Sequence, residues 1–254
     1  MKHVLSDSAL MFRRSLTHTF RSPEILVGIT VSPVMFVLLF RYVFGGAIDV
    51  GGTTYVNYLM AGIFVQTITF GSLTTAISLA SDLEKGIVER FFTLPMSRSA
   101  ILTGRTFADA LRAVFTIFVM VVVGVLVGYR PSGTLVNWFS ALMLMLFFGL
   151  AISWVGALMA LIVPNAEALQ QISFIIILPL TFASSAFVET STMPSALQTF
   201  ADNQPVTQVV NSVRALTLDQ PIGGAATATL AWCVGILVVA VPLSAVLFKR
   251  IGSR

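Results

Sequence analysis

The stretch that decides the fold is Trp138–Val163, which reads WFSALMLMLFFGLAISWVGALMALIV. It contains no Asp, Glu, Lys or Arg. About 20 mostly apolar residues in a helix cross the roughly 30 Å hydrocarbon core of a membrane. The run is continuous rather than alternating, so it predicts a membrane-spanning helix and not a strand of a barrel.

Five further stretches share this character, and the whole chain is poor in charge. It is 56% hydrophobic and 10% charged, whereas a soluble domain carries about 25% charged residues. A chain this apolar needs lipid as part of its solvent. The sequence therefore predicts an all-α integral membrane protein with one transmembrane domain over residues 1–254. Its six transmembrane helices are expected at approximately 24–44, 55–80, 113–128, 138–163, 169–188 and 228–248.

The distribution of Lys and Arg predicts the orientation, because cytoplasmic loops carry an excess of these residues. Six spans place both termini on one side, which then holds all basic residues except Arg130 and Arg214 on the other side and Arg41 at the outer end of the first span. We therefore expect both termini to be cytoplasmic. The net charge of +4 does not indicate nucleic acid, because the basic residues sit at span ends and not on one face.

Residues 1–23 have the pattern of a basic amphipathic helix. Apolar residues recur at helical spacing while basic residues take the other faces, as shown by Leu5, Ala9, Phe12, Leu16 and Phe20 against Arg13, Arg14 and Arg21. Such a helix lies on the membrane surface. It would serve as a membrane anchor or as a docking element for a cytoplasmic partner, and the pattern leaves both open.

The segment 81–112 reads SDLEKGIVERFFTLPMSRSAILTGRTFADALR and is expected in the cytoplasm. Its charges precede an apolar patch of Phe91, Phe92 and Leu94, after which Pro95 breaks the helix. The pattern predicts a protruding helical hairpin with aromatic residues at its tip. Exposed apolar groups ringed by charge usually mark an interaction site, and a solvated loop is the alternative.

The segment 189–227 is expected outside. Asn203-Gln204-Pro205 breaks a first short helix, and apolar residues then recur at helical spacing at Val206, Val209, Val210, Val213 and Leu216, with Gln208, Asn211 and Arg214 opposite them. The second piece is too short to span. It is predicted to dip into or lie on the outer leaflet, and a surface loop is the alternative.

The sequence lacks the constellations of the common enzyme classes. It has no GxxxxGK[ST] phosphate loop, no HExxH motif and no GxSxG nucleophile turn, and its only histidines are His3 and His18. The predicted spans also carry almost no Asp, Glu, Lys or Arg to relay protons or line an ion path. A transporter of this kind would take its energy from another protein.

The order of several short motifs resembles the membrane subunit of type-2 ABC exporters, in particular the daunorubicin-resistance permease group. The resemblance covers nearly the whole chain. Besides the N-terminal helix and the six spans, it rests on Glu84-Lys85-Gly86, Glu89-Arg90, Leu94-Pro95-Met96-Ser97-Arg98, Gly104-Arg105 with Asp109 and Arg112, and Asn203-Gln204-Pro205-Val206 with Arg214-Ala215.

This resemblance implies partners and sites. It implies a pair of cytoplasmic ABC ATPase subunits that bind ATP and Mg, a second permease copy or paralogue, membrane lipids, and the cytoplasmic (inner) membrane of a prokaryote. No catalytic residue, metal or cofactor is then expected in this chain. The segment 82–98 would be the coupling helix, with Glu84, Lys85, Glu89, Arg90, Phe91, Phe92 and Leu94 contacting the ATPase. Phe12, Arg13, Arg14 and Leu16 would belong to a connecting helix, and 193–216 would be a re-entrant element that closes the outer side.

The expected cargo is a hydrophobic or amphiphilic small molecule such as a drug, an antibiotic or a lipid-like metabolite. The residues expected to line its cavity are Phe64, Gln66, Phe70, Thr74, Phe174 and Phe182. Packing or lipid contact would equally explain aromatic residues in spans. Export of a polysaccharide or glycolipid by the same family, and a secondary transporter without a partner, remain alternatives.

Overall fold

The computed structural model describes residues 23–48, 50, 52–86, 98–163 and 165–251. Within these residues the regular structure is helical throughout, which confirms the predicted all-α class. The elements are α2 (Pro23–Leu39), a π-helical turn η1 (Phe40–Phe44), α3 (Tyr55–Glu84), α5 (Arg98–Leu126), α6 (Leu135–Ile162), α7 (Ala166–Phe182), a short 3-10 turn η2 (Thr190–Thr192), α8 (Ser195–Asn203), α9 (Pro205–Thr217) and α10 (Ala225–Ile251).

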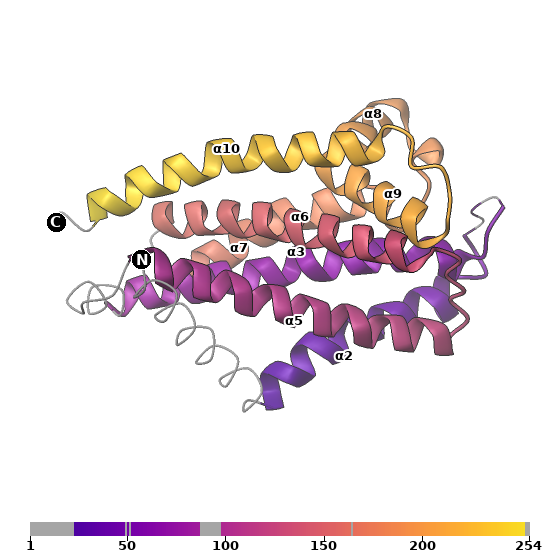
Figure 1. The fold of residues 1–254 in the computed structure, drawn as a ribbon, viewed down its shortest axis with the longest axis horizontal. Helices are drawn as coiled ribbons and strands as arrows, with labels where there is room; N and C mark the ends of the chain where they lie inside the picture. Colours follow the sequence, from indigo (N-terminus) through magenta and orange to yellow (C-terminus); the bar gives the residue numbers. More distant parts are fainter. Residues whose placement is uncertain (1–22, 49, 51, 87–97, 164, 252–254) are drawn as a thin grey trace.

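The long helices run back and forth along one axis and leave two distinct ends (Figure 1). At the loop end, α3 stops, α5 starts, α6 turns into α7, and α10 stops. At the opposite end, called the α9 end, lie α8, α9 and the α2–α3 and α5–α6 connections. The helix α3 is central, because it packs against α2, α5, α6, α7 and α9.

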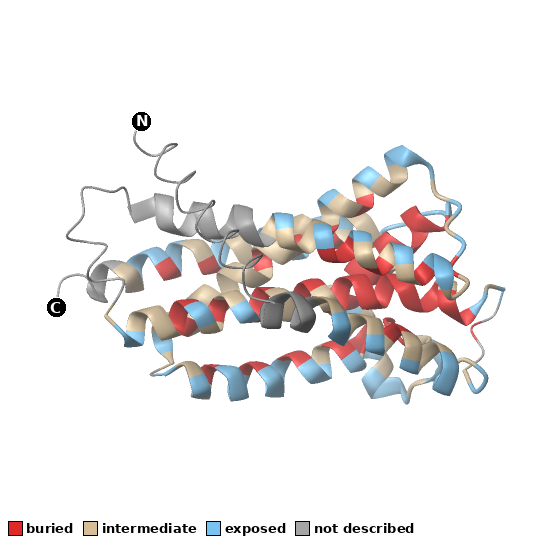
Figure 2. Cartoon of the chain, turned by 90° about the horizontal axis from the view of Figure 1, so that it is seen from below, coloured by how far each residue is buried: buried red, intermediate tan, exposed pale blue. Residues whose placement is uncertain are grey.

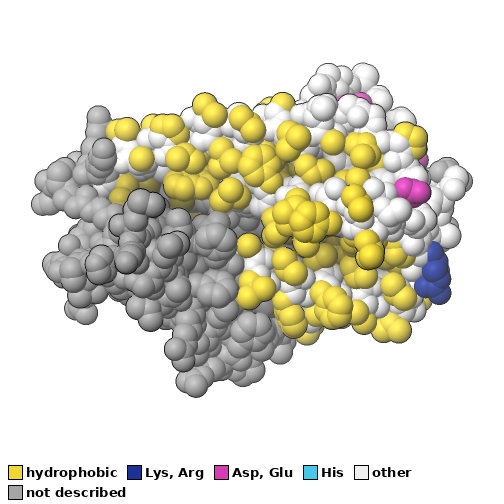
Figure 3. All heavy atoms as spheres, viewed as in Figure 1, with side chains coloured by type: hydrophobic (Ala, Val, Ile, Leu, Met, Phe, Trp, Pro, Cys, Tyr) yellow, Lys and Arg dark blue, Asp and Glu magenta, His cyan; other side chains and the backbone are white. Residues whose placement is uncertain are grey.

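Three of the helices are long and apolar enough to cross a membrane: Tyr55–Glu84, Leu135–Ile162 and the Ala225–Phe248 part of α10. The other three predicted spans fall on shorter apolar helical stretches, Thr30–Phe44, Ala110–Leu126 and Ala166–Phe182. Hydrophobic side chains cover the described part of the face in Figure 3, and the charged side chains visible there lie at the α9 end. A surface of this kind suits lipid.

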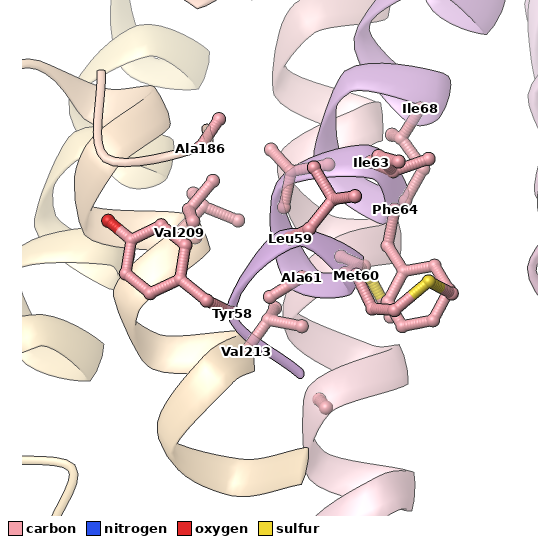
Figure 4. Close-up of a cluster of buried hydrophobic side chains, with 14 of the residues drawn as sticks. Tyr58, Leu59, Met60, Ala61, Ile63, Phe64, Ile68, Ala186, Val209 and Val213 are labelled. Atoms are coloured by element: carbon pink, nitrogen blue, oxygen red, sulfur yellow. The ribbon is translucent and has the colours of Figure 1, made fainter. Parts of the chain in front are cut away.

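Burial is deepest at the α9 end, where the buried residues gather in Figure 2. Between Tyr55 and Thr69 nearly every residue of α3 is buried, whereas from Phe70 onward buried and exposed positions alternate. Figure 4 shows part of this core, in which the Tyr58 side chain extends toward Val209 and Val213 of α9. The molecule is therefore most tightly packed at the α9 end.

The helices α3 and α6 approach closely because glycines of α6 face α3. A Cβ atom added at Gly149 would lie 2.8 Å from Ile68 Cγ2, and one added at Gly156 would lie 2.6 Å from Ala76 Cβ. The Ser72 hydroxyl also donates a hydrogen bond to the Gly149 carbonyl at 3.2 Å. Small residues that let helix backbones approach are the usual packing device between membrane helices.

Two features differ from the sequence expectations. The fifth apolar helix ends at Phe182 and not near residue 188, because Ala183 leaves helical geometry and Ser184 turns its hydroxyl onto the Thr181 carbonyl. The helix α9 is expected from the sequence to dip into or lie on the outer leaflet, but ten of its 13 residues are buried within the protein, Arg214 among them, so it does not lie on the molecular surface. Its polar face meets other parts of the protein, which hydrophobic periodicity does not reveal.

Candidate functional site

The described part of the predicted coupling segment begins at the end of α3, at the loop end. Glu84 is the last residue of α3, and Glu84 and Lys85 are both exposed. The chain turns away at Gly86, whose φ of +66° is one that residues with a Cβ rarely adopt. The remaining predicted coupling residues, Glu89, Arg90, Phe91, Phe92 and Leu94, lie outside the described residues, as do Phe12, Arg13, Arg14 and Leu16 of the predicted connecting helix.

Two of the predicted cavity aromatics meet across α3 and α7. The rings of Phe70 and Phe174 are 5.9 Å apart. Gln66 lies one helical turn before Phe70 and is 4% exposed, and its Nε2 has no hydrogen-bond partner among the described residues. Thr74 lies one turn after Phe70 and is exposed. Positions 66, 70 and 74 share one face of α3, and on this face Phe70 contacts Phe174 of α7.

The other two predicted cavity residues lie elsewhere. Phe64 is fully buried, and its ring makes edge contacts with Tyr129 and Trp138 at centroid distances of 6.3 Å each. Phe182 is 45% exposed and stacks on Phe187 at 5.1 Å. Their placement favours core packing for Phe64 and an aromatic cluster at the α9 end for Phe182. Cargo binding by any of the six residues stays a prediction.

A buried arginine organises the α9 end. The Arg214 guanidinium lies 3.6 Å from the centroid of the Tyr58 ring. It donates hydrogen bonds to the carbonyl oxygens of Tyr58 at 3.1 Å and Ser185 at 2.6 Å, and to Asn211 Oδ1 at 2.9 Å. One side chain thus joins α9 to α3 and to the connection between α7 and η2.

Neighbouring polar side chains continue this junction. The Ser185 hydroxyl donates to Asn211 Oδ1 at 2.7 Å, and the Ser185 N–H donates to the Thr207 hydroxyl at 3.3 Å. Gln204, at the break between α8 and α9, donates from Nε2 to the carbonyls of Leu180 and Ala183 at 2.7 and 2.8 Å. Those two carbonyls lie at the end of α7, where a helix leaves acceptors without partners of its own.

The electrostatics of Arg214 are those of a cation held by neutral acceptors. Burial lowers the pKa of Arg214, and the nearby Tyr58 and Glu189 act in the opposite direction. A guanidinium titrates so far above neutral pH that it stays charged here. Charge-assisted hydrogen bonds and a desolvated cation–π contact are stronger than their surface counterparts. The junction therefore combines a buried cation with hydrogen bonds that join α9 to α3 and to the turn after α7.

Sequence patterning places Arg214 on the outer side but does not predict this role. The available signal is a lone arginine in the apolar stretch VVNSVRAL, since arginine is almost never buried without partners. Nothing in the local sequence names Tyr58 or Ser185 as those partners. Among the described residues, no group of three or more His, Cys, Asp or Glu side chains is placed to hold a metal ion.

These observations define the class of the protein: an all-helical membrane protein with apolar helices and a locked polar junction at one end. Comparison with known proteins supplies the family. The chain belongs to the ABC-2 type transporter family, whose model matches residues 8–218.

Two curated relatives illustrate the similarity. The chain is 32% identical to the "Daunorubicin resistance ABC transporter permease protein DrrB1" of Streptomyces coeruleorubidus, over 80% of this chain and 74% of the relative. It is 26% identical to the "Probable doxorubicin resistance ABC transporter permease protein DrrC" of Mycobacterium tuberculosis, over 98% of this chain and 91% of the relative. Both relatives carry the name of an ABC transporter permease.

Proposed function

We propose that the chain is the membrane-spanning subunit of an ATP-driven exporter that moves a hydrophobic or amphiphilic small molecule out of the cytoplasm or the inner leaflet. ATP hydrolysis belongs to a separate pair of cytoplasmic ABC ATPase subunits, and the permease works as a dimer with a second copy or a paralogue. The observation that carries this proposal is the family match over residues 8–218 together with the drug-resistance relatives.

The geometry of the loop end supports the proposed ATPase contact. The helices α3 and α5 contain 30 and 29 residues, so each is roughly 45 Å long at about 1.5 Å per residue. Each therefore exceeds the roughly 30 Å hydrocarbon core. The charged groups Asp82 and Glu84 at the end of α3 and Arg98 at the start of α5 indicate that the additional helix length extends out of the membrane at the loop end. In this proposal, both helix ends project on the cytoplasmic side.

The proposed mechanism follows from this arrangement. Closure of the two ATPase subunits on ATP displaces the coupling segment, and α3 transmits the movement because it runs from that segment into the core of the bundle. A tilt of α3 against α7 reshapes the face formed by Gln66, Phe70, Thr74 and Phe174. Aromatic rings and a few polar groups suit a flat amphiphilic cargo, which is released when that face closes. ATP can drive the cycle only if it binds more tightly to the complex with closed ATPase subunits than to the complex with open ones.

Co-purification and vesicle transport test the function. A tagged chain purified from its native membrane should bring down a soluble ATPase with a phosphate-loop motif. Inside-out vesicles containing both proteins should accumulate daunorubicin when given ATP and Mg. Accumulation without ATP would favour a secondary transporter. ATP-dependent uptake of a lipid-linked sugar in place of daunorubicin would favour the glycolipid alternative.

The apolar tip of the coupling segment provides a sharper test of the ATPase contact. The double substitution Phe91→Ala and Phe92→Ala should abolish ATPase binding or leave ATP turnover that no longer drives transport. Phe139→Ala, at an exposed aromatic residue near the start of α6 and so at the α9 end, serves as the control and should leave both activities intact. Normal transport by the double variant would contradict the proposed contact.

A further inference from the structure

The two helices of the α9 end differ sharply in how they are held. Ten of the 13 residues of α9 are buried, and the helix packs against α3, α6 and α10. Only Ala201 is buried in α8, where Leu197 and Phe200 are 41% and 47% exposed. The main contacts of α8 are with α9 and η2. The segment predicted to act as one re-entrant element therefore consists of an embedded helix and a peripheral one.

Arg214 fixes the embedded helix to two other parts of the chain. Its side chain spans from α9 to the Tyr58 ring and carbonyl on α3 and to the Ser185 carbonyl after α7. Figure 4 shows the Tyr58 side chain beside Val209 and Val213 of α9. Two of the hydrogen bonds that the buried cation donates leave α9, one to the Tyr58 carbonyl and one to the Ser185 carbonyl, so a shift of α9 along α3 would separate the charge from these acceptors.

Direct backbone contact holds the third part of the junction in place. A Cβ atom added at Gly62 of α3 would lie 2.2 Å from the Ala186 carbonyl oxygen, so the turn after α7 rests directly on α3. The Tyr55 hydroxyl also donates to the Phe187 carbonyl at 3.2 Å. The 184–187 turn thus packs directly against the backbone of α3, whereas α9 is bonded to α3 through the Arg214 side chain.

The far side of α9 is held as well. The Ser212 and Thr229 hydroxyls are 3.1 Å apart between α9 and α10. The Gly133 N–H donates to the Thr217 carbonyl at 3.0 Å, which attaches the end of α9 to the α5–α6 connection. By contrast, within the described residues the side-chain bonds that reach the end of α8 from other helices are Trp232 Nε1 of α10 to the Asn203 carbonyl at 3.1 Å and Gln208 Nε2 of α9 to the Asp202 carbonyl at 2.5 Å.

We propose that Arg214 is a positioning residue that locks α9, the 184–187 turn and the first turns of α3 into one rigid block, so that α8 is the part of this segment free to move. Gln204 marks the boundary, because it lies between α8 and α9 and its side chain is bonded to the end of α7. The lock itself does not depend on the proposed function. If the proposed exporter function holds, α8 moves to open and close the outer exit for the cargo, and α9 stays in place beneath it.

Hydrogen exchange of the full chain in lipid nanodiscs, read by mass spectrometry, tests the lock without any partner or cargo. Amides of α9 and the 184–187 turn should exchange at least about tenfold more slowly than amides of α8, since local opening free energies follow burial and bonding. Arg214→Gln should raise exchange about tenfold or more in 184–187, in α9 and around Tyr58, because it removes charge-assisted bonds in a buried site. The middle of α6 and α10 should keep wild-type rates.

Matched variants separate the lock from a general loss of stability. Arg130→Gln makes the same charge change at an exposed arginine of the same end, whose guanidinium donates to the carbonyls of Val125 and Tyr129 close by in the chain, and should leave exchange unchanged. Tyr58→Phe keeps the ring face and should resemble the wild type, whereas Tyr58→Leu should raise exchange locally. Arg214→Lys keeps the charge and should restore part of the protection that Arg214→Gln loses.

Three outcomes would overturn the proposal. Exchange of α8 as slow as that of α9 in the wild type would show that the segment is one body. Wild-type exchange rates in Arg214→Gln would show that the guanidinium does not fix α9 to α3 and the 184–187 turn. An equal rise in every helix, with no recovery in Arg214→Lys, would assign Arg214 to overall stability. None of these results concerns ATP-driven transport, so the lock and the proposed function fail independently.

Discussion

Single atoms decide the packing at the α9 end, and Gly62 is the clearest case. Its missing side chain lets the Ala186 carbonyl approach α3 so closely that an added Cβ atom would lie 2.2 Å from the oxygen and 2.7 Å from the carbonyl carbon. Both contacted atoms are backbone, so no side-chain rotation relieves the overlap. Gly62 looks like an ordinary helical glycine in the sequence, but the close approach of Ala186 leaves no room for a side chain there.

Replacing this glycine gives a prediction at the residue scale. Gly62→Ala should lower stability by roughly 1–3 kcal/mol through overpacking, despite the better helix propensity of alanine. At about 2–4 °C per kcal/mol for a chain of this size, thermal unfolding in detergent should detect the change.

The matched control lies nine residues further along the same helix. A Cβ atom at Gly71 would have no neighbour within 4 Å. Gly71→Ala should thus hold or raise the unfolding temperature, by up to roughly 1 kcal/mol of propensity. Equal losses in the two variants would mean that helix packing around Gly62 is looser than described.

At the scale of elements, the pairing of α3 with α6 sets the frame of the bundle. The two helices form its most extensive contact, with Gly149 and Gly156 of α6 opposite Ile68, Ser72 and Ala76 of α3. In lipid, helices gain little from burying apolar side chains, so close backbone approach and dispersion carry the association. The small residues therefore determine how near α6 comes to α3.

A size exchange across this contact tests that reasoning. Gly156→Ala alone should destabilise the protein by roughly 1–3 kcal/mol, since its Cβ would lie 2.6 Å from Ala76 Cβ. Adding Ala76→Gly removes that atom, and the nearest remaining atoms are at 3.8 Å, an ordinary contact.

The double variant should therefore be more stable than the sum of the two single effects predicts. Thermal unfolding of all four proteins gives the coupling free energy, expected at roughly 1–2 kcal/mol. Additive losses would show that the two positions do not meet.

At the scale of the whole molecule, the two ends have different characters. The α9 end is densely packed and locked by polar contacts, whereas α3 becomes more exposed toward the loop end. A membrane subunit that receives movement at one end and seals the other would be built in this way. The proposed orientation places the loop end in the cytoplasm.

Cysteine labelling on intact cells tests this orientation. Cys233 is the only cysteine and is buried, so Cys233→Ala gives a clean background. Gln220→Cys, exposed at the α9 end, should react with a membrane-impermeant maleimide, and Lys85→Cys should react only after the membrane is opened. Labelling of Lys85→Cys from outside would reverse the topology and remove the basis for the cytoplasmic coupling segment.

Much of the architecture could be predicted from local pattern. The continuous apolar runs predicted helices because a backbone in lipid must satisfy its own hydrogen bonds. The break at Asn203-Gln204-Pro205 predicted the separation of α8 from α9, since proline begins a helix more readily than it continues one. The face of α3 that carries Gln66, Phe70 and Thr74 followed from helical spacing alone.

The sequence by itself thus determined that the chain is a helical membrane protein, where its helices run, and which segments fall between them. Only the tertiary structure decided that α9 is buried, that Arg214 bonds to Tyr58 and Ser185, and that Phe64 belongs to the core while Phe70 meets Phe174. The physical reason is range. Helix formation and membrane insertion depend on residues a few positions apart, whereas a buried cation is satisfied by carbonyls far away in the chain, and backbone carbonyls leave no mark in the sequence.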